Sequence, residues 1–520
     1  MSASITTNEQ TQTGTVILKP TPRWQTILMW VVPLALLAIA IYMRLYNLGQ
    51  PFDHDGYDEG VYWQSLRAMG AGYTLYQQIF YSQPPFFLLS TYPLFVLFGS
   101  TLWSARLGIA LISLLGLPGA FLMGKALNRR VGALVAMLLL VLDPFYLSMS
   151  QKIEAEVSSA AFSFLAVGAA YLWWENPDGT AGLYLAALSG ITLSLGILCK
   201  LLSITSIVPV GLLLLARLWQ ISSRWREHRG TNLRSLRPVI IVIAASSITL
   251  LVVLAPFLGS YSSMIRDVVA FHTDARALLI NNQVQNIKIM QSFLLGMLPL
   301  IIAALYGTLA ALLRRDWRVI PLVAWSLVTL YMLWIEVPLF YRHFIALIPP
   351  LIGLAVMGMG STSPVRSFFS RFRLPQLMTS LAVILILIII VTDIVQYRPY
   401  YQMVEKRGSD TYAKLEQRVA NDVHNSVTPD QLVVTDGQFV VSMAGRNTPP
   451  DLVDTSIVRI VSGYVTLQQL INDASQPRVH AVLFFMARLQ WQQVAAFHAW
   501  VSHHFHLKYR YGPGLELWVR

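Results

Sequence analysis

The chain has 520 residues, of which 55% are hydrophobic and only 12% are charged, and its mean hydropathy is +0.55. Soluble globular proteins carry about twice that charged fraction, so the composition indicates a polytopic membrane protein. The net charge of +12 comes from Lys and Arg in short loops between apolar runs, a pattern typical of membrane topology that argues against nucleic acid as a partner. The single cysteine, Cys199, excludes an intrachain disulfide.

Composition also predicts how the chain is divided. Residues 1–26 are expected to form a disordered cytoplasmic tail, because their first part is polar and rich in Thr and Gln. The run that follows lacks a clear cleavage site, so we expect it to remain as the first span. The prediction is a helical membrane region over 27–396, which would hold the functional site, and a small extracytoplasmic α/β domain over 397–520.

Hydropathy predicts about eleven transmembrane helices. The apolar runs fall near 27–46, 84–98, 102–124, 131–149, 157–174, 181–199, 201–218, 238–258, 291–313, 318–335, 340–360 and 376–394. The run 84–98 is short for a span and contains Pro93, so we interpret it as an interfacial helix in the first outer loop.

The distribution of basic residues sets the predicted orientation. If 84–98 does not cross and the N-terminus is cytoplasmic, the inner segments hold 17 Lys and Arg and the outer loops hold 7. A crossing at 84–98 would place the basic clusters outside, against the positive-inside rule. The acidic first loop, the turn at 152–156, the loop 259–290 and everything after 392 are then all outside, and 259–290 is long enough to act as a lid or to form a passive surface helix.

The first outer loop holds an acidic cluster in an otherwise acid-poor chain. Asp53, Asp55, Asp58 and Glu59 lie within seven residues. Carboxylates at a membrane face can act as a general base, bind a metal, or simply face water.

Two further outer segments carry charged residues. Lys152, Glu154 and Glu156 precede a predicted span, where the carboxylates could equally complement the helix dipole. Glu336, Arg342 and His343 follow another span, and Arg342 could bind a phosphate or anchor the interface. Acids and cations that converge at a membrane surface suit a phosphorylated, lipid-anchored substrate, and no HExxH, GxSxG or GxxxxGK[ST] motif competes.

The last 120 or so residues alternate predicted strands and helices. We expect helices near 410–425, 466–474 and 488–502, strands at 431–436, 439–443 and 479–485, and a hairpin over 504–519. None of the strands is followed by a Gly-rich phosphate loop, so we expect this domain to recognise or brace something.

The ordered motifs over roughly 25–400 resemble the GT-C superfamily of glycosyltransferases, and within it the branch of protein O-mannosyltransferases and aminoarabinose-to-lipid-A transferases (glycosyltransferase family 39). The motifs are Asp58-Glu59, Tyr62, Gly70-Ala71-Gly72, Tyr76, Pro84-Pro85, Phe98-Gly99, Ala105-Arg106-Leu107, Ser150-Gln151 with Glu156-Val157, and Arg342-His343 before Pro349-Pro350. Gln151 stands where the family usually has arginine, which leaves Lys152 as the phosphate ligand in that turn.

The resemblance implies an inverting transferase that moves a sugar from a polyprenyl-phosphate carrier to a protein, lipid or glycan acceptor at the outer face of the cell membrane, in building the cell envelope. It implies Asp58 as the general base, with Glu59 and Glu156 completing the catalytic group. Lys152 and Arg342 would hold the carrier phosphate, and the predicted substrate contacts also include His343, Tyr62 and Glu336. No cofactor is expected, although Asp53, Asp55, Asp58 and Glu156 offer oxygen ligands for a divalent cation.

Two alternatives stay open at this point. A carrier-lipid transporter would place ionisable residues in mid-span along a path, whereas here they gather at one face. A polymerase or ligase of surface glycans would share the same chemistry.

Overall fold

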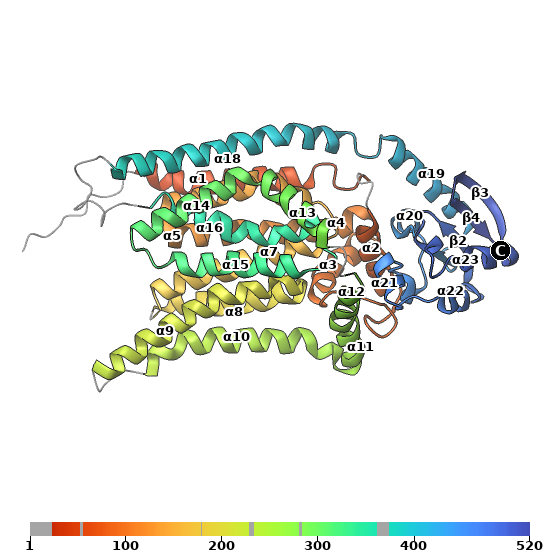
Figure 1. Cartoon of the computed structure of the whole chain (residues 1–520), viewed down its shortest axis with the longest axis horizontal. Coiled ribbons are helices and arrows are strands. Elements are labelled where there is room, and N and C mark those ends of the chain that lie inside the picture. Colours follow the sequence, from red (N-terminus) through yellow and green to blue (C-terminus); the bar gives the residue numbers. More distant parts are fainter. Residues whose placement is uncertain (1–22, 52–55, 178, 228–232, 280–282, 361–373) are drawn as a thin grey trace, which may run out of the picture.

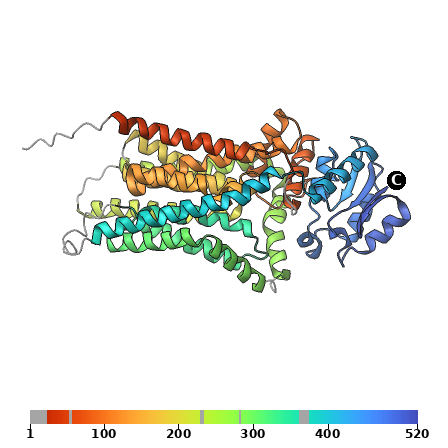
Figure 2. The same ribbon diagram turned by 90° about the horizontal axis from the view of Figure 1, so that it is seen from above.

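The computed structural model describes residues 23–51, 56–177, 179–227, 233–279, 283–360 and 374–520. Long helices form a bundle, and a smaller α/β domain lies at one end of its long axis in both views (Figure 1; Figure 2). The bundle is built from α1 (Arg23–Leu45), α4 (Leu102–Leu114), α5 (Gly116–Leu142), α7 (Ala155–Glu175), α8 (Thr180–Cys199), α9 (Ile207–Glu227), α10 (Arg237–Leu254), α14 (Leu298–Leu313), α15 (Val319–Ile335), α16 (Ile348–Met357) and α18 (Leu374–Glu405).

Six helices in the described part of the chain are long and apolar enough to cross a membrane, or seven if α13 and α14, bent by 77°, form one span. Four apolar helices are shorter, so the count of eleven stays a prediction. The multi-pass character is confirmed. The predicted interfacial run is α3 (Phe86–Leu97), whose twelve residues reach only about 18 Å and fall short of the ~30 Å hydrocarbon layer.

The segment Gly116–Leu142 contains two helical arms rather than one straight helix. Asn128 and Arg129 have non-helical backbone angles, and a Cβ on Gly124 would lie 2.1 Å from the carbonyl oxygen of Gly132. Residues eight apart in a straight helix would be about 12 Å apart, so the chain reverses here. This reversal separates the predicted runs 102–124 and 131–149.

The helix α7 forms the centre of the bundle, and 94% of its apolar window is buried. Close approach depends on small residues, since a Cβ on Gly119 or Gly168 would lie 2.6 Å from the facing backbone. At 1.5 Å per residue α7 spans about 30 Å, so Glu156 and Glu175 lie at opposite ends of the bundle. Glu175 pairs with Arg318 at 3.0 Å, which places one of the predicted inner basic residues at the end away from Glu156.

Short helices cover the end of the bundle that faces the α/β domain, where Figure 1 shows α2, α3, α11 and α12. The connecting elements are α2 (Tyr57–Gly70), α3, α6 (Pro144–Met149), η1 (Leu201–Ser206), η3 (Ala255–Ser260), α11 (Tyr261–Ile265), the π-helical turn η4 (Arg266–Ala270), α12 (Phe271–Leu279), α13 (Gln283–Gly296) and η6 (Tyr341–Leu347), with η2 (Leu233–Leu236) before α10. The predicted outer loop 259–290 is therefore largely helical in its described part.

The C-terminal region forms a four-stranded sheet of order β1-β2-β4-β3, in which β1 and β2 are parallel and the other pairs antiparallel. Side chains of β2 alternate between two apolar clusters, with Val482 on one face and Leu483 on the other. The elements are α19 (Thr411–Ser426), β1 (Leu432–Thr435), α20 (Gln438–Met443), η8 (Pro450–Leu452), α21 (Ile457–Val461), α22 (Leu467–Ala474), β2 (Val479–Phe484), η9 (Arg488–Gln490), α23 (Ala496–His504), β3 (His506–Gly512) and β4 (Leu515–Val519).

Most of the predicted elements of this region are present, with two corrections. The predicted strand 439–443 is the helix α20, because so short an apolar run does not distinguish a buried strand from a buried helix. The predicted helix 488–502 is split into η9 and α23. The helix α18 also continues past the predicted boundary at 397 as far as Glu405, and most of the predicted tail 1–26 lies outside the described residues.

Candidate active site beside the C-terminal domain

The side chain of Arg342 joins two carboxylates from different helices. Its Nη2 atom contacts Oδ2 of Asp58, and its Nε atom lies 3.2 Å from Oε1 of Glu156. Asp58 is in the first turn of α2 and Glu156 in the first turn of α7. The Asp58 side chain remains one-third exposed, whereas Glu156 is buried. An accessible carboxylate therefore lies next to a buried ion-pair network.

Two more basic side chains surround Glu156. Lys200 Nζ lies 2.7 Å from Oε1 of Glu156, and His343 Nε2 lies 3.8 Å from the same oxygen. The other oxygen of Glu156, Oε2, is buried and has no hydrogen-bond partner in the described part of the chain. Negative charge at the start of a helix is favourable, but here Arg342, Lys200 and His343 also lie within 4 Å of the carboxylate. Glu156 thus does more than complement the helix dipole.

Glu59, the neighbour of Asp58, points into the protein. Both of its oxygens accept hydrogen bonds from Arg106, at 2.7 and 2.6 Å, and Oε1 also accepts from the backbone N–H of Ile153 at 2.9 Å. Arg106 is fully buried and also donates to the backbone carbonyls of Leu48 and Gln50, in the turn that follows α1. The pair therefore ties α2 to α4 and to the turn before α7, which fixes the direction in which Asp58 leaves its helix.

Glu154 and Lys152 lie in the turn that precedes α7. Burial raises the pKa of Glu154 from 4.5 to about 7, while the charges of Arg342 and Lys152 oppose the rise. Its Oε2 atom is buried without a hydrogen-bond partner among the described residues. This carboxyl can hold a proton at neutral pH beside Asp58.

Tyr62 and Glu336, the other two predicted substrate contacts, have partners of their own. Tyr62, one turn after Asp58, is buried against the rings of Tyr81 and Phe87, at centroid distances of 6.2 and 5.0 Å. Glu336 directly follows α15, and its backbone carbonyl accepts from Asn286 at 2.7 Å. No hydrogen bond or ion pair joins Glu336 to Arg342 among the described residues.

The helix that carries Asp58 is packed against the C-terminal domain. A Cβ on Gly60 would lie 2.4 Å from the backbone nitrogen of Phe439, so the two backbones touch. Gln64 donates to the carbonyl of Arg446 at 3.0 Å, and the Tyr57 hydroxyl donates to Asp454 at 2.9 Å. The domain therefore packs directly on the helix that carries Asp58.

Sequence reasoning assigned no role to two residues of this network, Lys200 and Arg106. Each is a single basic residue beside or inside an apolar run, and such residues commonly mark the edge of a span. Their position between long apolar segments was the available signal, because an ionisable group there needs a partner.

Comparison with known proteins supports the same fold. Residues 76–261 match the family model for dolichyl-phosphate-mannose-protein mannosyltransferases, and comparison with curated proteins gives no sequence match. The structure of ArnT from Cupriavidus metallidurans bound to undecaprenyl phosphate covers 96% of this chain and 98% of its own, with 15% identity and a TM-score of 0.60. This chain has the GT-C fold.

A second GT-C structure aligns over most of the chain. The archaeal oligosaccharyltransferase AglB from Archaeoglobus fulgidus, solved with an inhibitory peptide and a dolichol-phosphate, covers 96% of this chain and 75% of its own, with 13% identity and a TM-score of 0.50. The mannosyltransferase-family match over 76–261, which includes Glu156 and Lys200, identifies the chain as a membrane glycosyltransferase. The predicted superfamily and enzyme class are thus confirmed.

In this GT-C protein, the departure at Gln151 has a structural counterpart. The Gln151 amide is buried, donates to the backbone carbonyl of Met43 at 2.8 Å, and accepts from Arg407 at 2.7 Å and from the hydroxyl of Tyr400. The side chain fastens the end of α1 to the end of α18. It is therefore placed for structure rather than for contact with a phosphate.

The structure describes two of the four carboxylates that could bind a divalent cation, Asp58 and Glu156. Asp53 and Asp55 lie outside the described residues. Within the described ranges, no three His, Cys, Asp or Glu side chains gather closely enough to hold a metal ion. Asp58 and Glu156 are instead joined by Arg342.

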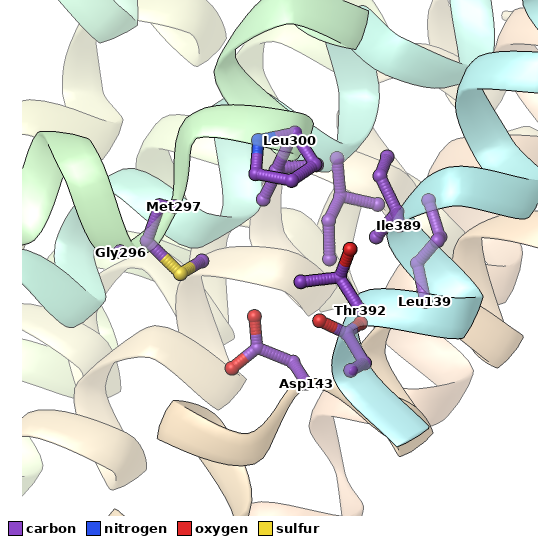
Figure 3. A pocket seen from close by; sticks show the side chains of 10 residues that line it. Leu139, Asp143, Gly296, Met297, Leu300, Ile389 and Thr392 are labelled. Atoms are coloured by element: carbon purple, nitrogen blue, oxygen red, sulfur yellow. The ribbon is translucent and has the colours of Figure 1, made fainter. Parts of the chain in front are cut away.

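A separate cavity lies between α5, α14 and α18, where Asp143 and Thr392 face one another (Figure 3). Its volume is about 10 Å³, which is room for no more than one water molecule. A sugar or phosphate could not enter this cavity, so it is distinct from the site around Asp58.

Proposed function

We propose that this GT-C protein transfers a sugar from a polyprenyl-phosphate carrier to an acceptor hydroxyl at the outer face of the cell membrane, with inversion at the anomeric carbon. The observation that supports the proposal is the bridge between Asp58, Arg342 and Glu156, with Lys200 beside it. It combines a partly exposed base with several positive charges. In this orientation the N-terminus is cytoplasmic and the C-terminal domain extracytoplasmic.

The proposed step is a single displacement. Asp58 takes the proton of the acceptor hydroxyl as the acceptor oxygen bonds to the anomeric carbon. The bond from that carbon to the phosphate oxygen breaks, and its electron pair leaves on the carrier phosphate. Proton, bonds and charge balance without an oxidant or reductant, and attack from the face opposite the leaving group inverts the configuration.

The basic side chains would stabilise the departing phosphate as its negative charge grows. Arg342 offers several donors in one plane, and Lys152 and Lys200 add charge close by. Arg342 is occupied by Asp58 in the present structure. A donor phosphate that binds Arg342 would release the Asp58 carboxylate, so that the base becomes available once the donor is bound.

The other predicted residues take supporting roles in this proposal. Glu59 positions α2 through Arg106 rather than touching substrate. The free oxygen of Glu156 can accept a hydrogen bond from a sugar or acceptor hydroxyl. The undecaprenyl phosphate in the ArnT structure favours a carrier of the same chemical class. We expect no cofactor.

The proposal is tested with purified full-length protein and a panel of sugars linked to undecaprenyl phosphate. Release of undecaprenyl phosphate together with glycosylation of an envelope acceptor fraction is the expected result. A protein that flips the intact donor across vesicles without breaking the sugar–phosphate bond would support the transporter alternative and overturn the proposal.

A further inference from the structure

A second cleft lies between the first outer loop, η4 and the C-terminal domain. Its volume is about 460 Å³, within the ~300–1,000 Å³ of ligand pockets. Phe80 lines it from the first loop, Arg266 from η4, and Arg459, Tyr464 and Gln469 from the α/β domain. It is thus much larger than the cavity at Asp143 and opens where the domain meets the bundle.

The most informative residue of this cleft is Arg459. Its side chain is buried, its guanidinium stacks on the ring of Phe80 at 3.7 Å, and its Nη1 donates to the carbonyl of Asp451 at 2.6 Å. Its Nε–H is buried and has no hydrogen-bond partner among the described residues. Buried donors without a partner are rare in proteins, and an oxygen of a bound ligand would satisfy this one.

The cleft is directly connected to the catalytic helix. Arg459 donates to the backbone carbonyl of Asp454, and the Asp454 carboxylate accepts from the hydroxyl of Tyr57 at 2.9 Å. Tyr57 immediately precedes Asp58 on α2. Hydrogen bonds therefore connect the cleft to the start of the helix that carries the proposed base.

The lining favours a saccharide over a peptide. Aromatic rings, side-chain amides, two guanidiniums and the carboxylate of Asp451 offer flat apolar faces together with donors and acceptors for hydroxyl groups. A peptide bound by strand addition needs an open sheet edge, and the residues that line this cleft come from helices and turns rather than from β1–β4.

We propose that this cleft binds the saccharide portion of the acceptor, so that the C-terminal domain and the first outer loop together present an acceptor hydroxyl to Asp58. The inference rests on the proposed function, because it names the acceptor class of that same site.

Binding is measured with the full-length protein in detergent, in an Asp58→Asn background that prevents turnover. The probes are an oligosaccharide pool released by mild acid from the envelope of the producing cells and a tryptic peptide pool from the same envelope. Saturation-transfer NMR reports which pool contacts the protein. Gln469→Trp fills the cleft, and Gln468→Trp, on the exposed side of the same helix, is its matched control.

The expected result is transfer to sugar-ring protons that is lost in Gln469→Trp and kept in Gln468→Trp, with equal thermal midpoints for the two. Equal signals in both variants, no signal from the saccharide pool, or signals from the peptide pool alone would overturn the inference. Failure of the proposed function is recognised separately, because saccharide binding would persist while the wild-type protein releases no carrier phosphate from any donor.

Discussion

Asp58 and Glu156 lie on different helices and far apart in the sequence, yet a single guanidinium contacts both carboxylates. Arg342 supplies it from a third element, η6. The three residues meet at the end of the bundle covered by the α/β domain. The proposed function requires these two acids to lie at the same end of the bundle, and the contacts of Arg342 bring them together there.

Replacing Asp58 with asparagine should remove transfer and leave the fold intact. General-base catalysis contributes about 10²–10⁴-fold, so we expect a loss of that size. Asp58 is partly exposed and its replacement is isosteric, so the thermal midpoint should change little. Carrier-phosphate release in membranes and size-exclusion thermal scans measure the two effects. Normal turnover by this variant would remove Asp58 from the role of base.

The neighbouring carboxylate should behave in the opposite way. Glu59→Leu leaves the buried Arg106 guanidinium without its ion-pair partner, and breaking a buried pair costs about 3–5 kcal/mol. We therefore expect a large drop in thermal midpoint, and activity lost in proportion to the fraction unfolded. A stable but inactive Glu59→Leu protein would instead show that Glu59 acts in the chemistry.

Donor binding should depend more on the geometry of the Arg342 guanidinium than on its positive charge. Lysine keeps the positive charge but carries it on a single nitrogen, whereas Arg342 contacts Asp58 and Glu156 through two different nitrogens of one planar group. We expect Arg342→Lys to raise the KM for the lipid-linked donor about tenfold, equivalent to about 1.4 kcal/mol, and Arg342→Gln to raise it further. Initial rates at varied donor concentration separate KM from kcat, and equal KM values in all three proteins would argue against phosphate binding by Arg342.

The contact between α2 and the C-terminal domain should matter for turnover. Gly60→Ala inserts a methyl group where a Cβ would lie 2.4 Å from the Phe439 nitrogen, so α2 must shift. Misplacement by about 1 Å can cost up to 10²-fold in rate, so we expect kcat to fall by about 10- to 100-fold. Gly70→Ala, at the end of the same helix with open space around the Cβ position, is the control. Equal rates for both variants would show that the domain does not position Asp58.

The free energy of unfolding should decrease as pH rises from 4.5 to about 7, the interval between the unfolded and native pKa values of Glu154. The native carboxyl keeps its proton up to about pH 7, whereas the unfolded chain releases it near 4.5. The native state binds more protons between these values, so its stability falls by about 3 kcal/mol from pH 4.5 to 7. Glu154→Gln should abolish this fall, seen as a higher thermal midpoint than wild type at pH 8 but not at pH 4. Glu405→Gln, at an exposed position, should follow the wild-type profile, and an unchanged profile in Glu154→Gln would contradict the prediction.

The sequence by itself determined the membrane class, the positions of the apolar helices and three residues of the candidate site, Asp58, Glu156 and Arg342. These follow from local properties, because an apolar run must satisfy its backbone within a helix, and charged residues between such runs gather at its ends. Repeated strand and helix patterns likewise predicted a small α/β domain.

Only the tertiary structure decided how those charges are paired. In the sequence, Lys200 and Arg106 are single basic residues without an acidic neighbour. In the structure, their partners Glu156 and Glu59 come from helices remote in the sequence. The apolar run 439–443 became the helix α20, packed against Gly60. The physical reason is the same in each case. The partner of a buried charge, or of a short apolar segment, depends on contacts between elements remote in sequence, and local periodicity does not encode those contacts.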